Sequence, residues 1–174
     1  MIAARDPAPE PPQKMSDPAD LLAAYLDFYR DALLRKLEGL SERQLRTSVL
    51  PSGWTPLELL KHLAHVERRW LCWGFAGEQV VDPWGDDGSD GRWHVADDET
   101  VEDVTAFFMT QCRRSREIVA GARLTDVAAA GGRFTPPAVR PALSRILFHL
   151  LQEYARHVGQ LDVVRELIDG AVGE

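Results

Sequence analysis

The sequence predicts an all-α fold, a four-helix bundle with long interhelical loops. Four long stretches carry apolar residues at helical spacing, each begins near a capping residue or a proline, and no stretch alternates apolar and polar residues as a strand would. The breaks between the stretches are rich in glycine and proline. A chain of 174 residues suits one core. We expect residues 16–174 to form a single domain, and residues 1–15, with their Ala-Pro-Glu-Pro-Pro run, to form a disordered N-terminal extension.

The first predicted helix runs from Pro18 to about Gly39. A Ser-Asp pair directly before Pro18 supplies a capping side chain, and proline is well tolerated in the first turn. A short polar connection follows, in which Ser41 and Gln44 have the spacing of a capping box. One face of this helix carries Leu22, Tyr25, Leu26, Tyr29, Leu33 and Leu37.

The second helix has the clearest start signal in the chain. Thr55 is the cap, Pro56 takes the first helical position, and Glu58 completes a capping box. We expect this helix to end near Phe75. Residues 76–99 then form a long acidic loop, and a loop of this length in a compact domain is more often functional or mobile than idle.

The third and fourth helices complete the pattern. Thr100 and Asp103 open the third helix, which ends near Gly121. Residues 121–138 contain a Gly-Gly and a Pro-Pro pair and are expected to be a loop. The fourth helix should cover about residues 141–169.

Charge and cysteine content exclude several classes of function. The net charge of −7 repels phosphate backbones, so nucleic acid is not an expected partner. The arginine-rich runs 67–69 and 113–116 lie within helical patterns, where we interpret them as solvated helix faces. Cys72 and Cys112 are expected to be reduced thiols. With no secretory signal and no membrane-spanning apolar stretch, the sequence predicts a cytoplasmic protein.

The fourth helix places two chemically useful side chains at the edge of its apolar stripe. By the helical wheel, Glu153 and His157 both border the core and lie one turn apart on one face. A glutamate there needs an explanation, because burying an unpaired carboxylate is costly. Three explanations stay open: a buried ion pair, partial exposure, or coordination of a metal together with His157.

The second helix offers a third ligand. Its apolar stripe has His62 at its edge, whereas His65 points well away from the stripe. Three protein ligands from two facing helices would leave room for water or substrate on a metal. The alternative is that His62 is a hydrogen-bonded core histidine. His149, one turn before Glu153, is either a fourth ligand, a supporting group or a surface residue, and His94 is interpreted as a loop residue.

Three segments carry a resemblance to a known family. They are Ser52-Gly53-Trp54-Thr55, the run from Leu60 to Trp70, and the run from His149 to Glu166. The chain resembles the DinB-like superfamily, in particular its actinobacterial branch of mycothiol-dependent transferases and a mycothiol-dependent maleylpyruvate isomerase. The resemblance implies an up-down-down-up bundle that binds a divalent metal, zinc or nickel, through His62, Glu153 and His157. Glutamate in place of histidine as the first residue of the last pair leaves the identity of the metal open.

The resemblance also implies an activity. A metal-bound low-molecular-weight thiol, such as mycothiol, would be the nucleophile of a transferase or isomerase acting on a small molecule. Arg145, Tyr154 and Arg156 lie near the site by helical spacing and could orient an anionic thiol. The alternatives are a non-catalytic, metal-binding stress or interaction protein, and a metal-dependent hydrolase that uses bound water. Proteins with this resemblance often pair as homodimers. We expect the loop at 76–99 to border the mouth of the metal site.

Overall fold

The computed structural model describes residues 9–172 and confirms the all-α fold class. Within these residues the only strand-like pairings are two isolated bridges, Asp87 with Trp93 and Val127 with Ala142. The expected disorder of residues 1–8 lies outside the described part of the chain. The helical elements are α1 (Pro18–Leu37), α2 (Glu42–Leu45), α3 (Pro56–Glu67), the π-helix η1 (Arg68–Phe75), α4 (Val101–Ala120) and α5 (Leu143–Asp169).

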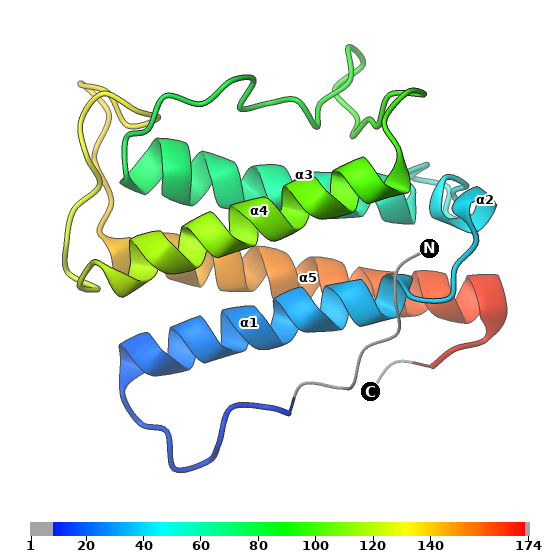
Figure 1. Ribbon diagram of the computed structural model, residues 1–174, viewed down its shortest axis with the longest axis horizontal. Helices are drawn as coiled ribbons and strands as arrows, with labels where there is room; N and C mark the ends of the chain where they lie inside the picture. Colours follow the sequence, from blue (N-terminus) through cyan, green and yellow to red (C-terminus); the bar gives the residue numbers. More distant parts are fainter. Residues whose placement is uncertain (1–8, 173–174) are drawn as a thin grey trace.

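Four long helical rods lie side by side, the second of them formed by α3 and η1 (Figure 1). Helices α1 and α5 run in one direction, and α3 and α4 run in the other. The segment between η1 and α4 passes over α3 on the side away from α1 and α5. Across residues 9–172, no helix has both the length and the apolar character needed to cross a membrane.

The helix starts follow the predicted capping residues. The Asp17 side chain accepts hydrogen bonds from the first turn of α1, and capping boxes form at Thr55 and Thr100. The box at Ser41 opens the four-residue helix α2, which the sequence suggested only as a polar connection. Each such cap contributes about 1 kcal/mol. The helix boundaries are therefore set locally.

The second long helix ends at Phe75 as predicted, but its last eight residues wind as a π-helix rather than an α-helix. The wider winding is continued by the Ala76 amide, which donates to the Leu71 carbonyl at 2.9 Å. Gly74 suits this geometry, because a Cβ there would lie 2.8 Å from the Arg69 carbonyl oxygen. Single π turns within α-helices are frequent at functional sites.

The core between the helices is dominated by leucine. A fully buried leucine side chain stabilises the folded state by roughly 1.5–3 kcal/mol, so the helices pack mainly through these residues. Leucines with no exposed surface occur on α1, α3, η1 and α5: they include Leu33, Leu37, Leu57, Leu59, Leu60, Leu63, Leu71, Leu143, Leu147, Leu150 and Leu161.

A buried carboxylate, Glu67, joins three of the helices. Arg30 on α1 donates to both Glu67 oxygens, at 2.8 and 3.0 Å, and the Tyr154 hydroxyl on α5 donates to Oε1 at 2.7 Å. Glu67 and Tyr154 have no exposed surface, and Arg30 is 4% exposed. The interpretation of residues 67–69 as a solvated face is thus wrong for Glu67 and Arg69, both of which are buried. Their partners come from distant parts of the chain, which a helical wheel does not show.

Replacing Tyr154 by phenylalanine tests how much the hydrogen bond from Tyr154 to Glu67 stabilises the fold. The variant leaves one hydrogen bond to a buried carboxylate unmade, so we expect the free energy of unfolding in urea to fall by about 1.5–3 kcal/mol. Tyr25→Phe is the matched control, because Tyr25 is a half-buried residue whose hydroxyl has no hydrogen-bond partner among residues 9–172. A loss in Tyr154→Phe no larger than that in Tyr25→Phe would contradict a structural role for this hydrogen bond.

Candidate metal centre

The structure brings His62 of α3 together with Glu153 and His157 of α5. Each offers one ligand atom, and the three atoms lie within 4.8 Å of one another. Glu153 Oε2 lies 3.2 Å from His157 Nε2 and 3.9 Å from His62 Nε2. These are the three residues that the helical wheel and the resemblance select. The side chains are 13%, 21% and 9% exposed for His62, Glu153 and His157, so solvent reaches the cluster.

Both histidine rings are held through their other nitrogen. His62 Nδ1 lies 2.9 Å from Asp86 Oδ2, and His157 Nδ1 lies 2.9 Å from Gln160 Oε1. Because a carboxylate and an amide oxygen only accept hydrogen bonds, each Nδ1 carries the proton. In a neutral ring, Nε2 then presents its lone pair toward Glu153. Metal-binding histidines are oriented in this way by a hydrogen bond from the opposite nitrogen.

Glu153 is an anion in this setting. Hydrogen bonding with His157, and then with His62, holds the pKa of its carboxyl well below the usual range. A carboxylate facing two imidazole lone pairs is repulsive unless a positive charge lies between them. That charge is either a second ring proton or a metal cation. Two nitrogen donors and one oxygen donor at this spacing therefore fit a divalent metal.

His149 lies on the other side of Glu153. Its Nε2 is 3.2 Å from Glu153 Oε1, and its ring centre is 4.1 Å from that of Trp70. Burial lowers the pKa of His149, which favours the neutral ring. His149 thus holds the carboxylate oxygen that faces away from His157, and it stays outside the three-residue cluster.

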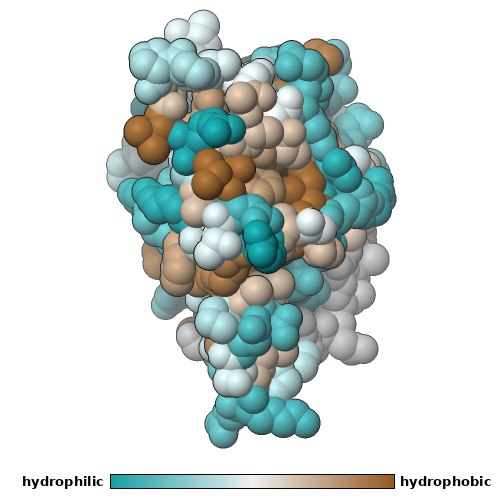
Figure 2. Space-filling view, turned by 90° about the vertical axis from the view of Figure 1, so that its left-hand side faces the viewer, coloured by the Kyte–Doolittle hydropathy of each residue, from teal (hydrophilic) through white to brown (hydrophobic). Residues whose placement is uncertain are grey.

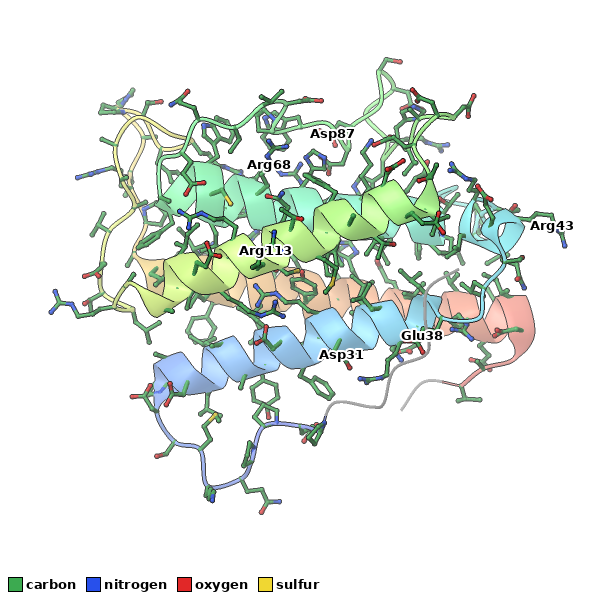
Figure 3. All side chains as sticks on the ribbon, viewed as in Figure 1. Asp31, Glu38, Arg43, Arg68, Asp87 and Arg113 are labelled. Atoms are coloured by element: carbon green, nitrogen blue, oxygen red, sulfur yellow. The ribbon has the colours of Figure 1, made fainter. Side chains whose placement is uncertain are left out.

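Asp86 is the site residue that sequence reasoning missed. It belongs to the 76–99 segment, has no exposed surface, and accepts from His62 and from both terminal nitrogens of Arg69. Burial alone would raise the pKa of Asp86, but the hydrogen bonds from His62 and Arg69 outweigh it and lower the pKa to about 2. Figure 3 shows this segment, with Asp87 labelled, above the helix that carries Arg68. The segment borders the cluster, as expected.

The sequence of α3 and η1 held a signal for a buried acidic partner, although it did not show which acid of the loop this would be. His62, His65 and Arg69 recur at i, i+3 and i+7, which places them on one helix face. The sequence predicted that His65 points away from the core stripe; in the structure His65 is only 4% exposed, because Asp86 and Phe107 cover it. Burial lowers the pKa of His65 to about 4. His65 Nδ1 lies 3.8 Å from Asp86 Oδ1, and His65 is not part of the cluster.

Trp93 forms an aromatic wall beside the cluster. Its ring stacks on His62 with centres 4.1 Å apart and an interplanar angle of 21°, and it meets His157 edge-on at 5.1 Å. Trp93 also lines a cavity of about 410 Å³ together with Trp54 and Arg92. Trp93 therefore contacts both this cavity and His62.

The remaining sequence candidates lie elsewhere. Tyr154 does not face the cluster, since its hydroxyl is bound to Glu67 in the core, while Arg145 and Arg156 are exposed. Cys72 and Cys112 are free and buried, and burial raises the pKa of each thiol to about 12. Neither cysteine is therefore a thiolate at neutral pH. His94 is an exposed loop residue, as interpreted.

Comparison with known protein families gives a match over most of the chain. The family model described as Mycothiol-S-transferase matches residues 21–170, a span that includes every helix from the first turn of α1 to the end of α5. Among curated proteins, nothing matches the chain.

The pKa of Asp86 predicts a specific acid sensitivity. A folded-state pKa of about 2, against ~3.9 in an unfolded chain, means that ionised Asp86 stabilises the fold above the unfolded pKa. That contribution is lost as the pH falls toward 2. With a chelator present, the free energy of unfolding should fall more steeply between about pH 5 and pH 2.5 in the parent than in Asp86→Asn.

The control is Asp87→Asn, which changes the exposed neighbouring carboxylate. This variant should keep the acid dependence of the parent in the same urea titrations. Equal slopes for the parent and Asp86→Asn would show that Asp86 is not the anchor of the segment.

Proposed function

Since the chain belongs to the mycothiol-S-transferase family, we propose that it is a metal-dependent enzyme that transfers a mycothiol-type thiol to an electrophilic small molecule. The observation that carries the proposal is the convergence of two imidazole nitrogens and an ionised carboxylate on one point, within 4.8 Å of one another. Such a donor set at a solvent-accessible position suits catalysis better than a closed structural site.

We assign the metal to His62, Glu153 and His157. When bound, a divalent cation there would lower the pKa of a coordinated thiol, so that a thiolate exists at neutral pH. Mixed nitrogen and oxygen donors suit zinc, our first choice, and also nickel. Three protein ligands leave coordination positions for the thiol.

The surrounding residues orient the ligands and restrict water. Asp86 and Gln160 fix the two ring orientations, and His149 fixes the carboxylate. Trp93 covers one face of His62, so water approaches from the remaining open side. A positioned and partly dehydrated site strengthens the electrostatic interactions that hold an anionic nucleophile. We further propose that the protein is cytoplasmic and that it forms a homodimer.

Metal content tests the site directly. In His157→Ala a ligand is lost, so stoichiometric metal in the purified protein should disappear, whereas His65→Ala should retain it because His65 lies outside the cluster. A chelator should lower the melting temperature of the parent, since a cation bound only by the folded state stabilises it by mass action. The melting temperature of His157→Ala should not respond to the chelator.

Two outcomes would count against the assignment. Loss of metal in His65→Ala, with metal retained in His62→Ala, would show that the ligand on this helix is His65, one turn after His62. Full metal content in both His62→Ala and His157→Ala would rule out a metal site at these residues. It would favour the alternative of a non-catalytic interaction protein.

Thiol transfer is tested with mycothiol and 1-chloro-2,4-dinitrobenzene. In the expected reaction a carbon–sulfur bond forms, the carbon–chlorine bond breaks, chloride leaves with the electron pair and the thiol proton passes to solvent. The absorbance of the thioether should grow faster with the parent than with His157→Ala or chelated protein. Metal-dependent hydrolysis of ester substrates without any thiol, and no thioether formation, would favour the hydrolase alternative.

A further inference from the structure

Arg133 carries a positive charge that nothing in the described chain neutralises. No carboxylate among residues 9–172 lies within ion-pair distance of it, and its Nη1 is buried without a hydrogen-bond partner. Its guanidinium carbon lies 4.1 Å from the ring centre of Trp70 and 5.4 Å from that of Trp84. Burial, and then the nearby charge of Arg69, lower the pKa of Arg133. The charged form of Arg133 is therefore less favourable here than it would be in water. A partly desolvated donor without an acceptor is costly.

The backbone is built to hold Arg133 in this place. Gly131 has a φ of +98°, and a Cβ on Gly132 would lie 1.9 Å from the Trp73 carbonyl oxygen, so the chain touches η1 here. The Arg133 amide donates to that same carbonyl at 3.1 Å. The position of Arg133 is therefore fixed by contact with the π-helix and does not depend on its own side chain.

Arg133 is connected to the metal cluster through two rings, those of Trp70 and His149. Trp70, on which Arg133 stacks, also contacts His149 at 4.1 Å, and His149 Nε2 lies 3.2 Å from Glu153 Oε1. The connection lies toward the end of the molecule at which η1 ends and α5 begins. Figure 2 shows that apolar residues gather in the middle of this end and that hydrophilic residues surround them.

We propose that Arg133 binds the carboxylate of a small substrate whose apolar part lies against Trp70 and Trp84. A guanidinium presents parallel donors that match a carboxylate, and both indoles supply apolar contact area. Arg69 and Arg133 both lie over the Trp84 ring, but Asp86 already neutralises Arg69, so Arg133 is the unpaired guanidinium of the two. A monoanion fits this balance better than a phosphate, which needs more donors. As a subsite for the electrophile, this assignment rests on the function proposed above.

Binding of benzoate to the metal-loaded protein tests the assignment. Calorimetry and tryptophan fluorescence should show saturable binding of benzoate, and weaker binding of the neutral isostere benzamide by at least about tenfold. Arg133→Met keeps an apolar side chain on Trp70 but removes the charge, and should weaken benzoate by a similar factor. Arg43→Met is the control, since Arg43 is exposed on α2 at the opposite end of the molecule (Figure 3). It should bind benzoate like the parent.

The other outcomes separate this assignment from the proposed function. Chelated protein should still bind benzoate, and Arg133-dependent binding there supports the site even if thiol transfer fails. Loss of benzoate on chelation, with retention in Arg133→Met, would place the carboxylate on the metal and overturn the proposal. Binding of inorganic phosphate but not benzoate would overturn the carboxylate assignment, as would equal binding of benzamide. Circular dichroism and melting of Arg133→Met exclude unfolding as the cause of any loss.

Discussion

The hydrogen-bonded carboxylate of Glu67 sets the relation between the helices on which the candidate site depends. Its partners, Arg30 and Tyr154, hold α1 and α5 against the end of α3. Glu67 lies five residues after His62, and Tyr154 directly follows Glu153. Fixing Tyr154 on Glu67 therefore fixes the rotation of α5 that turns Glu153 and His157 toward His62. Breaking a buried pair of this kind by removing one partner costs about 3–5 kcal/mol.

A second feature of the molecule is that α3 is buried on two faces. One face packs in the leucine core, and the other is covered by the 76–99 segment through Asp86. Asp86 is bound by His62 of α3 and Arg69 of η1, and Trp93 of the same segment stacks on His62, so both charge and aromatic contact attach the segment to this helix. The segment also gives the cluster a wall that the helices alone do not provide.

The sequence predicted the features that depend on neighbouring residues in the chain, namely the helix starts and the helix faces. Capping residues located the starts of α1, α3 and α4, and the helical wheel selected His62, Glu153 and His157 because their angular positions do not depend on loop conformation. The resemblance to mycothiol-dependent transferases is confirmed by the family match. The metal itself stays a proposal.

Other features depend on contacts that one sequence does not reveal. Asp86 is one of several acids in its loop, and only the folded segment distinguishes it from Asp87. Glu67 resembled a solvated helix residue because its partner, Arg30, lies in another helix. The π winding of η1 and the docking of Gly132 on Trp73 are likewise products of tertiary packing.

The π-helix has a further consequence for the evolution of this chain. A π turn holds one more residue than an α turn, so losing one codon within 68–75 would let the helix rewind regularly. Because the π winding absorbs the extra residue, the residues after such a deletion would keep nearly the orientation that they have now. One small deletion would thus remove the π winding while leaving the ligands on α3 and α5 in place.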